Sequence, residues 1–78
     1  MKKVGVGIIG SGSIADIAHC PAIRQLDNAE LVALCDSDQQ TLDRMSRKWE
    51  PKRTYTNYQD LIKDKEIDVV IIATPNYL

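Results

Sequence analysis

The sequence predicts an α/β fold in which four parallel strands alternate with helices. The 78 residues contain three continuous apolar runs and one short segment with high β-propensity. Turn-forming or acidic residues follow each of these four segments. Apolar residues at helical spacing lie between these runs. Because alternating strands and helices form parallel sheets with right-handed crossovers, we expect a partial doubly wound parallel sheet with the spatial order 3-2-1-4.

The first predicted strand is Val4–Ile9, a continuous apolar run that is typical of a central strand covered on both faces. Gly5 and Gly7 share one side of this strand, where two absent side chains allow a helix to lie close. The strand ends at Gly10, which begins a Gly-Ser-Gly turn.

A helical segment and a turn lead to the second strand. We expect a helix over Ser13–His19, which Pro21 cannot continue without losing a hydrogen bond. Pro21 instead opens a short second helical segment that runs through Leu26. Asp27-Asn28 predicts a turn, and the apolar run Leu31–Cys35 predicts the second strand.

The longest predicted helix follows the second strand. Ser37 or Asp38 can cap it, and it runs to about Trp49. Leu42, Met45 and Trp49 recur at helical spacing and predict its buried stripe.

The last third of the chain predicts a strand, a short helix and a strand. We predict a short third strand at Thr54-Tyr55, and Asn57 can cap a helix through Lys63. We expect Leu61 and Ile62 to face the core from this helix.

The fourth predicted strand is the apolar run Val69–Ala73, ended by Pro75. In the order 3-2-1-4 its outer edge has no partner from the chain, an arrangement that favours self-association. We therefore expect residues 1–78 to be the N-terminal portion of a larger domain.

Composition excludes several classes of protein. The hydrophobic content of 44% is ordinary for a globular protein. The formal net charge of −1 and an isoelectric point near 5.7 argue against a general binder of nucleic acids or membrane surfaces. No apolar run approaches the roughly 18–20 residues that span a bilayer. Cys20 and Cys35 lack the spacing of a metal site, and two reduced thiols favour a cytoplasmic protein.

The glycine turn after the first strand predicts a site for a dinucleotide. Gly10 permits the tight turn, and Gly12 removes a Cβ that would block a pyrophosphate. The N–H groups of Ser13 and Ile14 then lie in the first helical turn, where the helix dipole favours phosphate. A turn that only packs a helix on the sheet, with no ligand, remains the alternative.

An acidic residue at the end of the second strand supports the dinucleotide interpretation. Asp36 lies 26 residues after Gly10, close to the spacing of an acid that binds the adenosine ribose. The alternative is that Asp36 only helps to cap the following helix. Ser37 is placed in the same site. Residues 37–40 contain no Arg or Lys to receive a 2′-phosphate, so we expect NAD rather than NADP.

Four segments of the chain together resemble the glucose–fructose oxidoreductase/inositol dehydrogenase (Gfo/Idh/MocA) family: GIIGSGSIA, LVALCD, YTNYQDL and IDVVIIATPN. The resemblance implies a Rossmann domain that binds NAD(P) and takes part in reversible hydride transfer at a hydroxyl-bearing carbon of a sugar, cyclitol or similar polyol. It also implies that Thr74, Pro75 and Asn76 hold the cofactor between its adenosine and its nicotinamide ribose. Such proteins are often homo-oligomers.

No catalytic and no metal-binding residue can be assigned within the 78 residues. The resemblance implies that the catalytic lysine and the substrate domain follow Leu78, so we expect these 78 residues alone to be inactive. Two other functions stay open: a non-catalytic NAD-binding or redox-sensing module and, less readily, an S-adenosylmethionine methyltransferase. The Thr-Pro-Asn segment and the glycine spacing argue against the methyltransferase.

Overall fold

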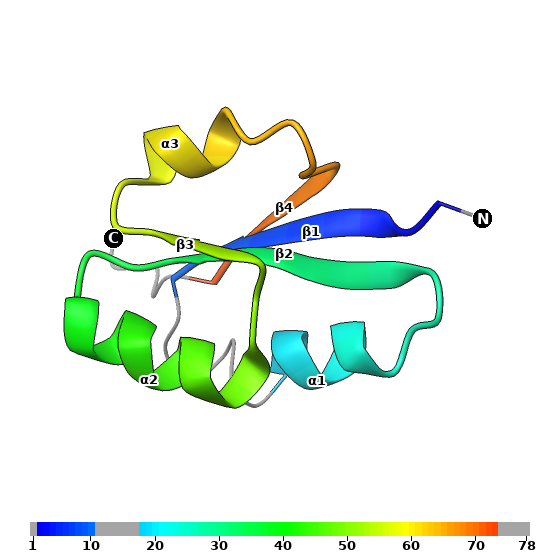
Figure 1. Ribbon diagram of the computed structural model, residues 1–78, viewed down its shortest axis with the longest axis horizontal. Coiled ribbons are helices and arrows are strands. Elements are labelled where there is room, and N and C mark those ends of the chain that lie inside the picture. The colour runs from blue at the N-terminus through cyan, green and yellow to red at the C-terminus, as the bar shows by residue number, and fades with distance from the viewer. Residues whose placement is uncertain (1, 11–17, 74–78) are drawn as a thin grey trace.

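A computed structural model describes residues 2–10 and 18–73, and its sheet has helices on both faces. Figure 1 shows α1 and α2 on one face and α3 on the other. In chain order the elements are β1 (Val4–Ile9), α1 (Cys20–Arg24), β2 (Ala29–Cys35), α2 (Gln39–Trp49), β3 (Arg53–Tyr55), α3 (Tyr58–Ile62) and β4 (Val69–Ile72).

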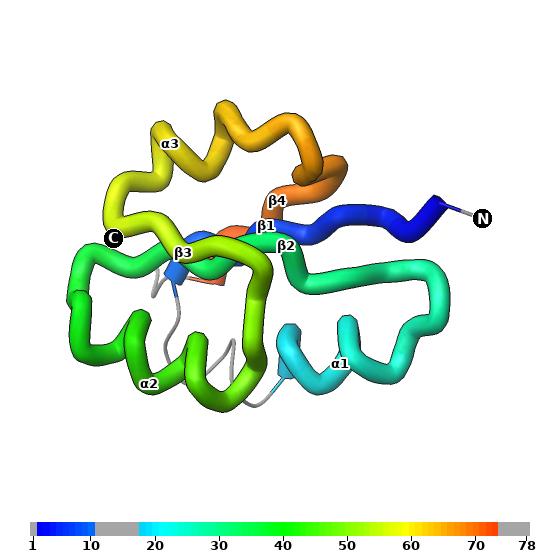
Figure 2. The backbone as a smooth tube through the Cα atoms, in the orientation of Figure 1, coloured from blue at the N-terminus to red at the C-terminus, as the bar shows by residue number. Residues whose placement is uncertain are grey.

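The four strands form one parallel sheet in the order β3-β2-β1-β4, which confirms the predicted fold class. β1 therefore lies between β2 and β4, as the backbone trace in Figure 2 also shows. The register between β1 and β2 shifts between Val6 and Gly7. The order brings the first and the last strand of the described chain together.

Each face of the sheet carries its own apolar cluster. On the face of α1 and α2 the buried members are Val6, Ile8, Cys20, Ile23, Leu34, Leu42 and Met45. The second cluster contains Val32, Ala33, Cys35 and Leu61. Because both faces of the central strands are covered, β1 and β2 are continuous apolar runs rather than alternating ones.

The first half of the chain follows the prediction closely. β2 begins at Ala29, two residues before the predicted Leu31. α1 starts at Cys20 with Pro21 in its first turn, where a missing N–H costs nothing. Residues 13–17 of the predicted first helix lie outside the described residues.

The second half confirms both predicted helix caps and corrects one buried position. The side chain of Asp38 accepts a hydrogen bond from the N–H of Gln40, and Asn57 caps α3 in the same way. Leu61 is fully buried, but Ile62 is 58% exposed, so the prediction that both face the core was wrong. A helix of five residues presents a narrow stripe to the sheet, and Leu61 fills it.

Gly5 and Gly7 allow a close approach on the α3 face, as predicted, although a turn rather than a helix lies against Gly5. A Cβ on Gly5 would overlap the carbonyl oxygen of Glu66, and a Cβ on Gly7 would lie 2.8 Å from Cδ1 of Ile67. The N–H of Gly5 also donates to Oδ2 of Asp68 at 2.8 Å. The absence of side chains at the two glycines therefore allows the turn that precedes β4 to pack directly against β1.

None of the helices in the described part of the chain has the length and apolar character to cross a membrane.

Candidate functional site

The carboxyl ends of the strands are tied to one another by backbone hydrogen bonds. The N–H of Gly10 donates to the carbonyl of Cys35 at 2.7 Å, and the N–H of Asp36 donates to the carbonyl of Tyr55 at 3.1 Å. These bonds extend the ladder one residue beyond β1 and β2. Gly10, Asp36 and the segment after Tyr55 therefore leave the sheet at the same edge.

Gly10 has the backbone conformation that the predicted turn requires. Its φ is 93°, in the region that favours glycine, and the residue is buried. Of the nine predicted site residues, the structure describes Gly10, Asp36 and Ser37 and brings all three together. The other six, Gly12, Ser13, Ile14, Thr74, Pro75 and Asn76, lie outside the described residues.

A pocket of about 190 Å³ lies at this edge of the sheet. Its walls come from three strand ends and are formed by Ile9, Gly10, Cys35, Asp36, Ser37, Thr56 and Tyr58. Thr56 and Tyr58 were not predicted as site residues. The signal for them was available, because the loop after the third strand of a parallel sheet must emerge at the same edge as the first two.

Asp36 takes part in the local turn as well as in the pocket. Its Oδ1 accepts a hydrogen bond from the N–H of Asp38 at 2.8 Å. Asp36 therefore does help to shape the start of the following helix, which was the alternative to a role in ligand binding. The cap of α2 itself is Asp38, whose Oδ2 accepts from the hydroxyl of Thr41 at 2.7 Å. A carboxylate has about four acceptor positions, so a role in this turn is compatible with a role in binding ligand hydroxyls.

The charges around the pocket are acidic. Burial, and then the nearby carboxylates of Asp36 and Asp60, raise the pKa of the Cys35 thiol, which keeps it neutral. The hydrogen bond from Thr41 lowers the pKa of Asp38, which stays ionised. No Lys or Arg is among the described residues that line the pocket. A hydroxyl-rich ligand suits this environment better than a phosphate on the ribose.

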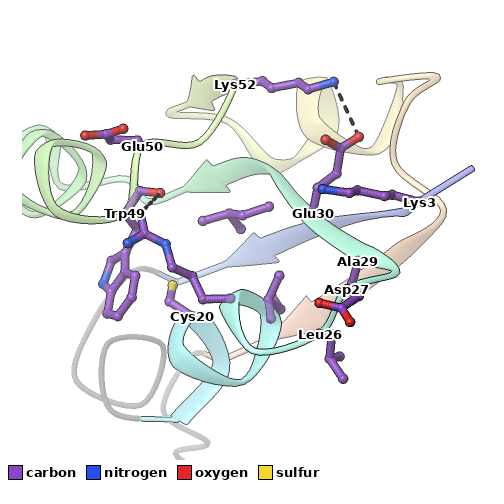
Figure 3. Close-up of a pocket in the computed structure, with 12 residues that line it drawn as sticks. Lys3, Cys20, Leu26, Asp27, Ala29, Glu30, Trp49, Glu50 and Lys52 are labelled. Carbon is purple, nitrogen blue, oxygen red and sulfur yellow. Dashed lines mark hydrogen bonds and ion pairs between the residues drawn. The ribbon is translucent and has the colours of Figure 1, made fainter.

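A larger hollow of about 440 Å³ lies elsewhere, between α1, the end of α2 and β2 (Figure 3). Two of the cations that line it have partners: the guanidinium of Arg24 lies 5.3 Å from the ring centre of Trp49, and Lys52 pairs with Glu30 at 3.4 Å. Trp49 is half-buried and packs against the core, as its predicted place in the stripe requires. This mixed set of acidic and basic side chains indicates no particular ligand.

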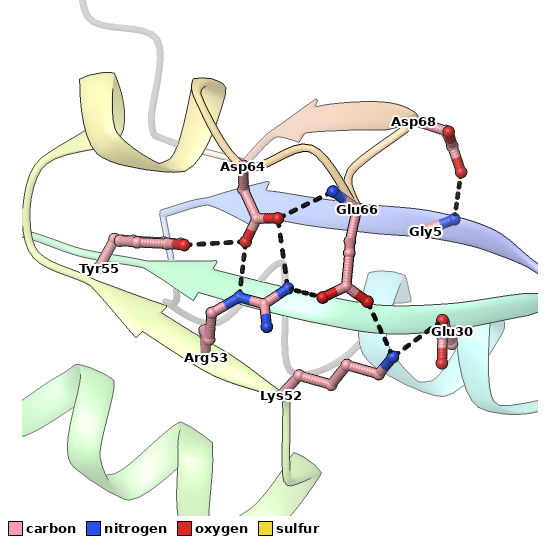
Figure 4. Close-up of polar contacts among 8 residues, drawn as sticks. All are labelled: Gly5, Glu30, Lys52, Arg53, Tyr55, Asp64, Glu66 and Asp68. Atoms are coloured by element: carbon pink, nitrogen blue, oxygen red, sulfur yellow. Dashed lines mark hydrogen bonds and ion pairs between the residues drawn. The ribbon is translucent and has the colours of Figure 1, made fainter.

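A polar network on the α3 face was missed by sequence reasoning (Figure 4). The carboxylate of Asp64 accepts from Nε of Arg53 at 2.7 Å, from the hydroxyl of Tyr55 at 2.8 Å and from the N–H of Glu66 at 2.9 Å. These bonds, above all the one from Arg53, lower the pKa of Asp64 to about 2. Glu66 in turn binds Arg53 and Lys52. The network joins β3 to the turn before β4.

Within the described residues no group of three or more His, Cys, Asp or Glu side chains is arranged to hold a metal ion. The described part of the site consists of Gly10, the carboxylate of Asp36 and a small pocket. A parallel sheet in the order β3-β2-β1-β4, with a glycine of positive φ after β1 and an acid after β2, is characteristic of a dinucleotide-binding α/β domain.

Comparison with known proteins gives the family. Residues 4–78 match the model of the GFO_IDH_MocA family, described as an oxidoreductase family with an NAD-binding Rossmann fold. The chain belongs to this family, which confirms the predicted resemblance.

Individual relatives cover the chain almost completely. A "Glycosyl hydrolase family 109 protein" of Shewanella pealeana is 38% identical over 81 residues, which include 92% of this chain and 16% of the relative. The WlbA dehydrogenase from Bordetella pertussis, solved in complex with NADH and UDP-GlcNAcA, has a TM-score of 0.88 and 30% identity, over 96% of this chain and 22% of its own.

A third relative is the myo-inositol 2-dehydrogenase from Lactobacillus plantarum, with a TM-score of 0.82 and 31% identity. The match covers 95% of this chain and 22% of that protein. The 78 residues thus span less than a quarter of the length of the relatives they match.

Proposed function

We propose that this chain binds NAD at the carboxyl edge of its sheet. The observation that carries the proposal is the pairing of Gly10, with its positive φ, and Asp36 on neighbouring strand ends that open on one pocket. The glycines Gly10 and Gly12 leave room for the pyrophosphate, and the N–H groups of Ser13 and Ile14 donate to it.

The remaining predicted residues complete this proposed site. Asp36 and Ser37 bind the hydroxyls of the adenosine ribose, and Thr74, Pro75 and Asn76 line the crevice between the ends of β1 and β4. Such a crevice is the topological switch point at which open α/β sheets bind ligands. Residues 1–78 are then the N-terminal portion of a Rossmann domain.

NAD is preferred over NADP in this proposal. The carboxylate of Asp36 repels a 2′-phosphate, and the described lining of the pocket offers no cation to compensate. Repulsion of about 1–4 kcal/mol at short range corresponds to roughly 5- to 1,000-fold discrimination. The similar WlbA dehydrogenase was solved with NADH, which agrees with this preference.

For the whole protein we propose hydride transfer between NAD and a hydroxyl-bearing carbon of a sugar, cyclitol or similar polyol. NAD supplies the hydride acceptor, and the residues of this chain bind and orient it. The sugar-nucleotide and inositol dehydrogenases among the similar structures support this substrate class. We also propose a cytoplasmic homo-oligomer. None of the described residues is assigned to proton transfer.

The name of the Shewanella relative favours a second candidate, a glycosidase that requires NAD. Some glycoside hydrolases are NAD-dependent. Both candidates use the same dinucleotide site, so they differ in the fate of the substrate rather than in the residues described here. A dehydrogenase accumulates NADH with a polyol, whereas a glycosidase releases the leaving group of a chromogenic glycoside without accumulating NADH.

The binding proposal is tested on the whole protein with titrations of NAD and NADP. We expect NAD to bind at least about fivefold more tightly, and Asp36→Asn to remove most of that preference. Asparagine keeps an oxygen that can accept from the N–H of Asp38, so the turn is preserved. Asp43→Asn, an equal change of charge on the exposed side of α2, is the control and should leave the preference unchanged. Equal affinities of the unmodified protein for the two cofactors would contradict the proposal.

A further inference from the structure

We infer that Tyr58 is a positioning residue of this site, and that its ring forms the wall against which the adenine base of NAD packs. The inference rests on the proposed function and adds a residue that the sequence analysis did not place in the site. Tyr58 is the first residue of α3, is 51% exposed and lines the pocket together with Asp36.

The order of the strands gives the direction in which the base must lie. In the sheet, β1, β2 and β3 are consecutive neighbours. With the pyrophosphate at Gly10 after β1 and the ribose at Asp36 after β2, the next group of the nucleotide points toward the end of β3. Thr56 and Tyr58 stand there. The group attached to this ribose, on the side away from the pyrophosphate, is adenine.

The size of the pocket fits one ring system. Its volume of about 190 Å³ is several times the share of about 30 Å³ that one water occupies in the liquid. Pockets that enclose a whole drug-sized ligand have about 300–1,000 Å³. The pocket is therefore of a size to receive one ring system but too small for a whole dinucleotide, the rest of which would lie along the edge of the sheet.

The chemistry of the walls also fits a flat aromatic group. Ile9 and Cys35 contribute apolar surface, and the thiol of Cys35 stays neutral for the reasons given above. Among the described residues that line the pocket, Asp36 is the one acidic side chain, and it lies on the side of the proposed ribose site. An aromatic side chain at the open side adds a face on which a base can stack, a contact worth roughly 5- to 150-fold in affinity.

The experiment compares Tyr58→Ala, Tyr58→Phe and Ile62→Ala in the whole protein. Ile62 is the matched control, because it lies one turn further along α3, is similarly exposed and does not line the pocket. Each variant is titrated with NAD, AMP and ribose 5-phosphate, and folding is checked by circular dichroism. Ring protons of Tyr58 are followed by NMR during the AMP titration, with Tyr58→Phe used for assignment.

We expect Tyr58→Ala to lower the affinity for NAD and for AMP by at least about fivefold. The affinity for ribose 5-phosphate, which has no base, should stay unchanged. Tyr58→Phe and Ile62→Ala should bind like the unmodified protein, and AMP should shift the Tyr58 ring signals. Unchanged AMP affinity in a folded Tyr58→Ala variant overturns the inference, as does an equal loss in Tyr58→Phe, which would assign the contact to the hydroxyl. If the unmodified protein binds neither NAD nor AMP, the proposed function fails instead.

Discussion

Replacing Asp64 by asparagine tests how the polar network holds β3 to the turn before β4. Only 5% of the Asp64 side chain is exposed, and its carboxylate accepts bonds from Arg53, Tyr55 and Glu66. Asp64→Asn keeps the shape of the side chain and removes its charge. Its amide group can present N–H donors to the Arg53 guanidinium, which has no acceptor to offer.

The size of the effect follows from the pKa of Asp64. A fall from the ordinary 3.8 to about 2 corresponds to about 2 kcal/mol of stabilisation of the charged native form. Because the side chain of Arg53 is 37% exposed, solvent screens part of this pair. We therefore expect Asp64→Asn to lower the free energy of unfolding at neutral pH by about 1–2 kcal/mol.

The pH dependence gives the sign of the same effect. A carboxyl group whose pKa is lower in the folded than in the unfolded chain stabilises the fold above about pH 4, and this contribution disappears as the pH falls toward 2. The unmodified protein and Asp64→Asn should thus differ at pH 7 and converge near pH 2. Urea unfolding followed by circular dichroism measures both, with the exposed Asp60→Asn as control. A difference that stays constant from pH 7 to pH 2 would refute the charge-based reasoning.

Two further predictions concern glycines. Gly5→Ala should destabilise the protein by about 3 kcal/mol, because its Cβ meets the backbone of Glu66. Gly7→Ala should destabilise it by only about 1 kcal/mol, because its Cβ meets side-chain methyl groups. Urea unfolding that gives the reverse order of stability would contradict this reasoning. Gly12→Val should abolish detectable NAD binding by calorimetry while circular dichroism shows an intact fold, since the new side chain occupies the space of the pyrophosphate; unchanged affinity would place the ligand elsewhere.

The elements that sequence reasoning predicted well are those with local signals. β1 and β2 are continuous apolar runs bounded by turn residues, and Asp38 and Asn57 cap helices through bonds to residues two positions away. The strand order followed from the alternation of strands and helices. Gly10 and Asp36 were found because each directly follows a central strand.

The features that sequence reasoning missed depend on contacts between distant residues. Arg53 and Asp64 lie 11 positions apart on different elements, and no local pattern pairs them. Ile62 is apolar and next to a buried leucine, yet whether a five-residue helix buries one or two positions depends on how it sits on the sheet. Tyr58 was not predicted as a site residue, because its exposure and its place beside Asp36 are properties of the fold.

The central position of β1 has a consequence for folding kinetics. β1 is an interior strand only after β4 has paired with it, and the bond between the N–H of Gly5 and Asp68 joins residues 63 positions apart. Closing so long a loop costs chain entropy before the contact returns any stabilisation. β1 and β2 can associate earlier, because their paired residues lie about 25 positions apart. During synthesis on the ribosome, the edge of β1 that faces β4 therefore stays open until nearly all of the described chain has emerged.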